Sequence, residues 1–371
     1  MVGPDVRVVD ANLHDHQAPV HVVVTNLDRA DEVLDAVSHA GASASFEDGR
    51  LRVVGKSTQL VDAAGRTGGA DLAEPLRERI DAALAAWRGE DVGALVTPAG
   101  DLPVHDRTVV MGIVNVTPDS FSDGGDHLDE DAAVAHGEAL LAAGADVVDV
   151  GGESTRPGAE AVDETTELAR VVPVVRRLAE AGAVVSIDTS KASVAAAAVA
   201  AGAAIVNDVS AGTLDEGLWS TVADLGVPYV LMHMQGTPRT MQDDPAYEDV
   251  VAEVFEHLAT NLAGLEAAGV DRDRVIVDPG LGFGKTTEHN LALLGAVRQF
   301  RSLGRPVLVG ASRKRFLGAV TGVDEAADRV VSSATAAALA VANGAHMVRV
   351  HDVAETVEAV RVADAVCRGQ E

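Results

Sequence analysis

Acidic, amide and basic side chains follow a series of short Val-rich runs in the last three quarters of the sequence. They include Asn115, Asp149, Asp188, Asn207, Asp208, Asp278, Ser312, Lys314, Arg349, His351 and Asp352. A single residue of this kind is usually a helix cap or part of a turn. A whole set, each at the end of a run, favours a binding site for a flat heterocycle rich in N–H donors and ring acceptors.

The last two of these clusters carry positive charge. They read Ser-Arg-Lys at 312–314 and Arg-Val-His-Asp at 349–352. In a barrel of eight parallel strands, the fold predicted below, arginine and histidine after the last strand lie where such folds commonly bind phosphate. Arginine also binds anions through two parallel hydrogen bonds. A solvated lysine is the plain alternative for Lys314, but its place in this cluster favours a function.

The elements that must position these side chains alternate along the chain from about residue 109. The apolar runs are Val109–Val114, Val147–Val150, Val184–Ile187, Ala204–Val206, Tyr229–Met232, Val275–Val277, Val307–Val309 and Met347–Val350. Helical patterns between or after them cover Glu130–Ala143, Thr165–Glu180, Ser190–Ala201, Tyr247–Ala268, His289–Phe300, Asp324–Ala342 and Ala354–Val366. Val-rich strands separated by helices predict a parallel sheet. Eight strand–helix units within roughly 260 residues match a closed (β/α)₈ barrel. An open doubly wound sheet is the alternative, but no Gly-rich dinucleotide fingerprint follows the first strand.

The predicted helices end in Ala-Gly-Ala or Asn-Gly-Ala turns. The glycines are Gly144, Gly182, Gly202 and Gly344. Each suits the left-handed position that closes a helix before the next strand. These turns belong to the bottom of the barrel, whereas the polar clusters stand at the other end, where barrel chemistry occurs.

The first 90 residues have a different pattern. They predict a strand at His21–Thr25, a helix at Arg29–Ala40, a hairpin from Ala44–Phe46 and Arg50–Val54, and a helix at Leu72–Trp87. We therefore predict an α/β protein, a (β/α)₈ TIM barrel at 91–371 with a small α+β extension at 1–90.

The composition limits the classes of partner. Acidic residues number 57 against 29 basic ones, which gives a formal charge of −28. Such a chain repels nucleic acid and anionic membranes unless positive charge is concentrated locally. The acidity and scarcity of lysine fit either a protein that works in concentrated salt or an acidic protein from a GC-rich genome.

Targeting features are not found in the sequence. No stretch approaches the roughly 20 apolar residues of a membrane span, and the N-terminus lacks the basic and apolar regions of a signal peptide. The single cysteine, Cys367, excludes an intrachain disulfide framework. We therefore expect a cytoplasmic protein.

Two of the polar segments resemble the signature loops of dihydropteroate synthases. They read NVTPDSFSDGG at 115–125 and DVGGESTRPG at 149–158. Asp188-Thr, Asn207-Asp, DPGLGFGK at 278–285, Ser-Arg-Lys and Arg-Val-His-Asp follow in the family's order. The resemblance covers about residues 92–371 without a departure at a functional position. It implies a transferase that joins a 6-hydroxymethyl-7,8-dihydropterin diphosphate to 4-aminobenzoate, releasing pyrophosphate, in folate biosynthesis.

The resemblance also implies a role for each site residue. Asp278, Asp188, Asn207 and Lys314 would bind the pterin, with the Asp278 carboxylate accepting two parallel N–H bonds, and Phe283 would be a further substrate-binding residue. Arg349, His351 and Asn115 would hold the diphosphate, with a Mg²⁺ ion bound at Asn115. Ser312 would seat the carboxylate of the aminobenzoate. The mobile loops would supply Phe121, Thr155, Arg156 and Pro157. Of these residues, the catalytic ones would be Asn115, Arg156, Lys314, Arg349 and His351.

Other features of the same resemblance concern assembly and mechanism. It implies a homodimer formed through helices late in the barrel, and a hairpin of Val92–Val96 with Asp101–Val104 at the barrel's lower mouth. Departure of pyrophosphate would leave a delocalised pterin cation that the neutral arylamine attacks, so no strong general base is needed. Loop closure would keep water from the cation.

Three other functions are weaker interpretations of the sequence. A pterin-dependent methyltransferase shares the barrel but has no use for an aminobenzoate site, and a non-catalytic pterin-binding protein would not need Arg156, Arg349 or His351. A P-loop is disfavoured because Gly280 to Gly284 encloses three residues and Gly49 to Gly55 encloses five, where the motif needs four.

Overall fold

The computed structural model describes residues 5–10, 19–25, 30–47, 50–64, 70–88, 92–117, 126–154, 159 and 161–368. The chain divides into two compact units. One comprises Met1–Val92 together with Arg298–Arg305, and the other comprises Gly93–Val297 and Pro306–Glu371.

The larger unit is built on eight parallel strands. They are β5 (Val109–Asn115), β6 (Val147–Gly151), β7 (Val185–Asp188), β8 (Ile205–Asp208), β9 (Tyr229–Met232), β10 (Val275–Asp278), β11 (Leu308–Val309) and β12 (Met347–Val350). Their order in the sheet is β10-β9-β8-β7-β6-β5-β12-β11. A parallel bridge between Val277 and Val307 joins the two end strands, so the sheet closes into the expected barrel.

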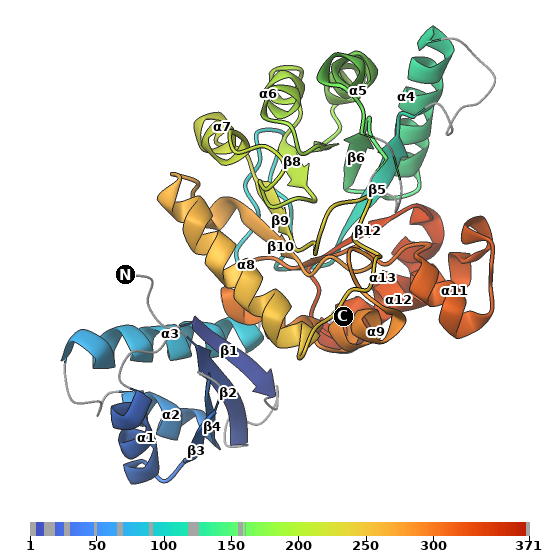
Figure 1. Cartoon of the computed structure of the whole chain (residues 1–371). Helices are drawn as coiled ribbons and strands as arrows, with labels where there is room; N and C mark the ends of the chain where they lie inside the picture. The colour runs from blue at the N-terminus through green and yellow to red at the C-terminus, as the bar shows by residue number, and fades with distance from the viewer. Residues whose placement is uncertain are drawn as a thin grey trace. The chain divides into compact units, whose positions relative to one another are not determined.

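Helices follow the strands of the barrel. They are α4 (Asp126–Ala142), α5 (Glu164–Glu180), α6 (Ala192–Ala200), α7 (Leu218–Leu225), α8 (Val250–Ala267), α9 (Thr287–Gly295), α10 (Val297–Phe300), α11 (Arg315–Thr321), α12 (Val330–Ala342) and α13 (Val353–Arg368), with short 3₁₀ turns η2 (Arg272–Arg274), η3 (Arg301–Leu303) and η4 (Ala326–Asp328). Figure 1 shows α4 to α8 outside the strands. Strands covered on both faces are nearly continuous apolar runs, as β6, β9 and β10 are in this sequence.

The glycine turns between helices and strands have the expected geometry. The φ angles are 106° at Gly144, 87° at Gly182, 114° at Gly202 and 96° at Gly344. A side chain at these angles would clash with the backbone, so glycine ends each helix and lets the next strand begin within a few residues. The short connections leave the opposite, carboxyl ends of the strands free to carry the longer loops.

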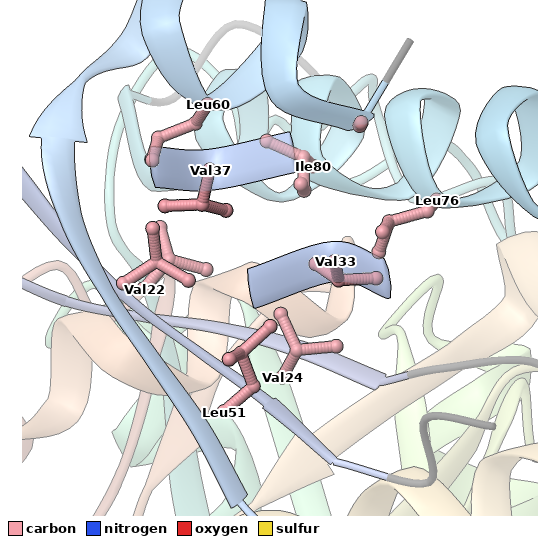
Figure 2. Close-up of a pocket in the computed structure, with 10 residues that line it drawn as sticks. Val22, Val24, Val33, Val37, Leu51, Leu60, Leu76 and Ile80 are labelled. Carbon is pink, nitrogen blue, oxygen red and sulfur yellow. The ribbon is translucent and has the colours of Figure 1, made fainter. Parts of the chain in front are cut away.

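The N-terminal unit is a four-stranded antiparallel sheet with helices. Its elements are β1 (Asp5–Asp10), β2 (Pro19–Thr25), α1 (Ala30–His39), β3 (Ser43–Glu47), β4 (Arg50–Lys56), α2 (Ser57–Ala64) and α3 (Ala70–Arg88). The strand order is β1-β2-β4-β3. Figure 2 shows its core, where Val22, Val24 and Leu51 from the sheet face Val33, Val37, Leu60, Leu76 and Ile80 from the helices. The cavity among them is about 10 Å³, too small and too apolar to be a ligand site.

Most of the elements expected from the sequence are present within a few residues of their expected ends. The sequence patterns did not predict β1 and α2 in the N-terminal unit, or α7 and α11 in the barrel. The hairpin before the barrel is present as a pair of hydrogen bonds between Leu95 and Leu102, whose side chains are buried. Its place at the lower mouth stays a prediction.

Candidate active site

Polar side chains from neighbouring strands lie in one row at the carboxyl end of the barrel. Asn115 on β5 pairs in register with Gly151 on β6, Gly151 with Asp188 on β7, and Asp188 with Asn207 on β8. Side chains at partner positions of parallel strands point to the same face. The row therefore brings together residues that are far apart in the sequence, with 92 positions between Asn115 and Asn207.

A cavity of about 690 Å³ opens at this end of the barrel, large enough for a small organic ligand. Seven of the residues expected at the site line it: Asn115, Asp188, Phe283, Ser312, Lys314, Arg349 and His351. Asn207 and Asp278 are not among the residues that line this cavity; they are 3% and 5% exposed at the ends of β8 and β10. Phe121, Thr155, Arg156 and Pro157 lie outside the described residues.

Arg349 lies on β12 between two carboxylates. Its Nε donates to Asp149 Oδ2 at 2.6 Å, and its Nη2 donates to Asp188 Oδ2 at 2.6 Å. Burial lowers the pKa of Arg349, but the two carboxylates outweigh it and raise that pKa overall. The guanidinium is therefore a fixed positive charge in the site.

The pKa of Asp188 is also shifted by these surroundings, in the direction that favours the neutral carboxyl group. Burial raises the pKa of Asp188 to about 7, although the charge of Arg349 opposes the shift; Asp149 and Glu167 add to it. This carboxyl group can therefore be protonated or ionised near neutral pH, and so it can donate or accept a hydrogen bond.

Asp278 and Lys314 form a second charged pair. Asp278 Oδ1 accepts a hydrogen bond from the backbone of Gly280 at 2.7 Å. Burial raises the pKa of Asp278, and the nearby Lys314 opposes the rise. Burial lowers the pKa of Lys314 to about 8, and Asp278 opposes the fall. The two side chains thus stabilise each other's charge in a site that disfavours either alone.

The position of Lys314 depends on a glycine in the facing loop. Its Nζ donates to the carbonyl of Leu281 and lies 4.7 Å from the centroid of the Phe283 ring. Gly282 has a φ of 85°, and a Cβ there would come within 2.8 Å of Lys314 Cδ. Glycine at position 282 therefore allows the positive φ angle of this loop and also leaves space for the Lys314 side chain beside it.

Ser312 and His351 meet where the loops after β11 and β12 come together. The Ser312 hydroxyl accepts from the backbone N–H of His351 at 3.1 Å and lies 3.1 Å from His351 Nδ1. Arg313, at a φ of 58°, donates to both oxygens of Asp352 at 3.0 and 2.5 Å. This fork fixes the turn that presents Ser312 and Lys314 to the cavity.

Lys285 lines the cavity but is bound by the protein itself. Its Nζ contacts His233 Nδ1 at 2.8 Å and donates to the carbonyl of Phe283 at 2.8 Å. Burial lowers the pKa of Lys285 well below its usual value, and burial with the charge of Lys285 lowers the pKa of His233 to about 2. Lys285 ties two loops together and is not arranged as a P-loop lysine.

Another cluster, buried at Glu167 and Thr189, supports the start of the second signature loop. Glu167 accepts from Thr189 Oγ1 at 2.7 Å and from Lys191, which also donates to Glu153 at 2.5 Å. Arg170 donates to the carbonyl of Gly152 at 2.8 Å. Helix α5 therefore fixes the chain up to Glu153, immediately before the residues expected to bind aminobenzoate.

Several residues that line the cavity were not predicted from the sequence as site residues. Met241, Gln242, Thr287 and Asn290 also line the cavity. Asn290 Oδ1 accepts from the backbone of Gly282 at 2.6 Å, so it holds the loop that admits Lys314. A polar residue inside a helix gives no sequence signal for such a contact, because the contact depends on how the helix meets the loop.

Comparison with known proteins identifies the family. Residues 111–351 match the model of the pterin binding enzyme family. The dihydropteroate synthase of Mycobacterium leprae is 51% identical over 262 residues, which is 69% of this chain and 92% of that protein.

Solved structures give the same result. A Xanthomonas albilineans dihydropteroate synthase with 4-aminobenzoic acid is 50% identical with a TM-score of 0.70, over 74% of this chain and 98% of that one. The Yersinia pestis enzyme in a sulfonamide drug complex is 42% identical with a TM-score of 0.71, and the match covers 75% of this chain and 100% of that one. The chain therefore belongs to the dihydropteroate synthase family of pterin-binding transferases.

Proposed function

We propose that the cavity at the carboxyl end of this barrel joins a 7,8-dihydropterin diphosphate to 4-aminobenzoate and releases pyrophosphate. The observation that carries the proposal is the arrangement around Arg349. A fixed guanidinium, held by Asp149 and Asp188, lies in one cavity with Ser312 and His351. The site combines donors for a diphosphate with buried carboxylates for an N–H-rich ring, as a pterin diphosphate requires.

The pterin ring would be bound at the floor of the cavity. Asp278 would accept hydrogen bonds from the amino-pyrimidinone edge, and Asp188 and Asn207 would bind other edges of the ring. Lys314 would donate to the ring carbonyl and a ring nitrogen, while Phe283 would contact the ring face. Burial strengthens each of these bonds because water does not compete for the same groups.

The diphosphate would lie between Arg349, His351 and Asn115. Mg²⁺ prefers oxygen ligands, keeps several waters, and is commonly held by one or two protein groups together with substrate phosphates. The Asn115 side chain at the cavity wall fits that donor set as a single protein ligand. A Mg²⁺ ion bound there would neutralise charge on the leaving pyrophosphate. Arg349 and His351 would stabilise the same developing charge from the protein.

The aminobenzoate would bind at the mouth of the cavity. Ser312 would donate to its carboxylate, and Phe121, Thr155, Arg156 and Pro157 would complete the pocket. The 4-aminobenzoic acid complex of the Xanthomonas relative supports a site for this substrate. The fixed chain at Gly152 and Glu153 supports a pocket next to the pterin, because both residues lead directly into the loop that carries Arg156.

The residues present suit a reaction without a strong general base. An aniline nitrogen is neutral at pH 7 and can attack the pterin methylene as pyrophosphate leaves. The protein would orient the two substrates, stabilise the leaving group and exclude water. The methyltransferase and the non-catalytic alternatives are not favoured, because the matched relatives are dihydropteroate synthases.

Measuring pyrophosphate release from the purified full chain tests this proposal. The complete mixture contains pterin diphosphate, 4-aminobenzoate and Mg²⁺, and three further mixtures each omit one component. Release that requires both substrates supports the synthase. Release without 4-aminobenzoate would indicate a diphosphatase, and no release in any mixture would contradict the proposal.

A homodimer is the assembly that the barrel's last helices support. Helices α12 and α13 pack against each other and expose large apolar side chains, with Val331 and Val366 each 79% exposed. Leu339 and Val362 are exposed on the same two helices. Four exposed apolar residues on paired helices are suited to a second copy of the same surface. Sedimentation should show a dimer that Val362→Glu weakens and that Val320→Glu, at an exposed valine of α11, leaves intact.

A cytoplasmic location is also part of the proposal. No helix in the described ranges is long and apolar enough to cross a membrane. Cys367, the single cysteine, is free and exposed, which suits a reducing compartment. Fractionation of cells that produce the chain would test this location, and recovery with the membrane pellet would contradict it.

A further inference from the structure

Asp149 is a buried carboxylate to which none of the substrate contacts proposed above is assigned. It lies in the middle of β6, a strand whose neighbouring residues Val148 and Val150 are apolar, and its side chain is 0% exposed. An ionised group in such a place is costly unless it is paired and hydrogen-bonded. An apolar side chain would serve the core better, so the position of Asp149 indicates a task beyond stability.

One oxygen of Asp149 joins two residues of the site. Oδ2 accepts from Arg349 Nε at 2.6 Å and from Asn207 Nδ2 at 3.0 Å. These donors come from β12 and β8, which stand on opposite sides of β6 in the sheet. The diphosphate-binding residue and the pterin-binding residue therefore share a single acceptor.

This bond fixes the direction of the Asn207 amide. A carboxylate oxygen can only accept, so Asn207 must turn its NH₂ group toward Asp149 and its carbonyl oxygen away from it. Turning the amide over would place two acceptor oxygens in contact. Asp149 thereby decides that Asn207 can offer a carbonyl acceptor to a ring N–H.

The same bond fixes the plane of the Arg349 guanidinium. Nε is held by Asp149 and Nη2 by Asp188, so two carboxylates grip one edge of the planar group. Arginine donates in a rigid fork, and holding this edge leaves both hydrogens of Nη1 for an anion. If Asp188 turns to a bound ring, Asp149 still holds the guanidinium through Nε.

The second oxygen of Asp149 supports a role outside stability. Oδ1 is buried and finds no hydrogen-bond partner among the described residues, and the same is true of Ser186 Oγ, at the register partner on β7. A buried polar atom without a partner is destabilising. The protein therefore tolerates a cost at the residue that connects Arg349 with Asn207.

We propose that Asp149 is a positioning residue, which holds Arg349 for the diphosphate and sets the amide direction of Asn207 for the pterin ring. The proposal rests on the functions proposed for Arg349 and Asn207. It means that the ring and the diphosphate are bound in one rigid frame. A substitution at Asp149 must therefore weaken both parts of this substrate while leaving the aminobenzoate site unchanged.

The test compares Asp149→Asn with Asp208→Asn. Asp208, the last residue of β8, is another fully buried carboxylate, but it accepts from Ser210, the Gly212 backbone and the Tyr229 hydroxyl, so it serves its own loop. Asp149→Asn should raise the Kd of 6-hydroxymethylpterin and of pyrophosphate each at least tenfold by calorimetry. It should lower kcat/KM for the pterin diphosphate by about a hundredfold or more, which corresponds to about 2.7 kcal/mol, while the Michaelis constant for the aminobenzoate stays within threefold. Asp208→Asn should leave all four quantities within threefold.

A double substitution separates positioning from a general loss of stability. If Asp149 positions Arg349 for the diphosphate, adding Asp149→Asn to Arg349→Met should raise the Kd of pyrophosphate by less than threefold beyond the single Arg349→Met variant. If Asp149→Asn does not fold, the swapped pair Asp149→Asn/Asn207→Asp keeps a donor facing an acceptor. That pair should still lose pyrophosphate binding at least tenfold.

Several results would overturn the proposal. The first is an unchanged pyrophosphate affinity in folded Asp149→Asn or in the swapped pair. The second is a double variant in which the losses of the two single substitutions multiply. The third is an Asp208→Asn variant with losses equal to those of Asp149→Asn. Failure of the proposed function is separate, because the wild-type chain would then release no pyrophosphate with both substrates, whatever the ligand affinities of the variants.

Discussion

The core of the N-terminal unit and the carboxyl end of the barrel use buried positions in opposite ways. The N-terminal core is a cluster of Val, Leu, Ile and Ala with Trp87, and the buried charged side chains among the described residues of that unit are Arg7 and Arg301. Both donate to neighbouring oxygens, Arg7 to Gln299 and Arg301 to the carbonyl of Ala86. The barrel end buries five carboxylates and a lysine: Asp149, Glu167, Asp188, Asp208, Asp278 and Lys285.

The difference shows where the protein accepts instability for the sake of function. A buried carboxylate needs partners to offset its lost hydration, and the barrel end supplies only some of them. Burial raises the pKa of Asp188 and of Asp278, so both are held in a site that opposes their charge. Substitutions in the two regions should therefore separate activity from stability.

The largest effect is expected for Arg349→Met. The substitution removes the cation proposed to bind the diphosphate and leaves Asp149 and Asp188 without it. Loss of a buried charge partner costs about 3–5 kcal/mol of stability. Loss of a donor to the leaving group should lower kcat/KM by about 100- to 1000-fold. Steady-state kinetics on the folded fraction, together with thermal unfolding, measure both quantities.

Leu51→Ala is the matched substitution in the N-terminal core. Leu51 is fully buried on β4, and the cavity left behind should cost about 2–5 kcal/mol. The folded variant should keep the wild-type kcat/KM. A parallel loss of kcat/KM in Leu51→Ala would remove the proposed distinction between the two regions.

Asp278→Ala should have the next largest effect. The loss of charge-assisted hydrogen bonds to the ring should weaken pterin binding by about 1.5–3 kcal/mol, roughly 10- to 150-fold. The stability should change less, although Gly280 loses the acceptor for its backbone N–H. Calorimetric titration with 6-hydroxymethylpterin measures the affinity, and an unchanged Kd would remove Asp278 from the pterin site.

Arg156→Ala should affect the two substrates unequally. We expect kcat and the affinity for 4-aminobenzoate to fall about tenfold or more, since a charged hydrogen bond contributes about 1.5–3 kcal/mol, while the Kd of the pterin stays within threefold. Equal losses for both substrates would place Arg156 in the pterin pocket. A sulfonamide, which complexes the Yersinia relative, should compete with 4-aminobenzoate, and noncompetitive inhibition would contradict a shared site.

A pH-dependent difference in stability is expected at Asp188. Its pKa rises from 3.8 in the unfolded chain to about 7 in the folded protein. The folded state thus holds the proton more tightly, and this contribution to stability is fully present below pH 3.8 and is lost as the pH rises through 7. Asp188→Asn removes the titration, so its stability relative to wild type should improve by about 2–3 kcal/mol from pH 5 to pH 8. Denaturant unfolding at both pH values measures the difference, and a constant difference would contradict the shift.

The smallest effect on chemistry is expected when the N-terminal unit is removed. A chain starting at Asp91 keeps every residue proposed for the site, so kcat/KM should fall by less than tenfold, about 1.4 kcal/mol. Thermal stability should fall more, because Arg298 and Arg301 lose the carbonyls of Trp87 and Ala86. A larger loss of kcat/KM with unchanged circular dichroism would show that the N-terminal residues take part in the reaction.

Much of the barrel was predictable because its signals are local. Val-rich runs indicated the strands, and glycine turns such as Gly144 and Gly344 indicated the ends of helices. The missed helices α7 and α11 have eight and seven residues, too few for a clear helical period. Strand β1 was missed because six residues near the N-terminus give little alternation to detect.

The sequence predicted where the polar residues of the site lie, but it did not predict their hydrogen-bond partners. The rule that barrel chemistry lies at the carboxyl ends of strands placed Asp188, Asp278 and Lys314 together, as the structure does. The grip of Asp149 on Arg349 joins residues 200 positions apart and depends on strand register. Spacing along the chain carries no information on which donor faces which carboxylate.

The most direct test of the proposed reaction is the stoichiometry of its two products. Purified full-length chain would be given pterin diphosphate, 4-aminobenzoate and Mg²⁺, and 7,8-dihydropteroate would be quantified by mass spectrometry beside pyrophosphate. We expect equal amounts of both products throughout the reaction, because a closed site delivers the pterin methylene to the arylamine and not to water. Pyrophosphate formed in excess together with hydroxymethylpterin, or without any dihydropteroate, would contradict the proposed synthase.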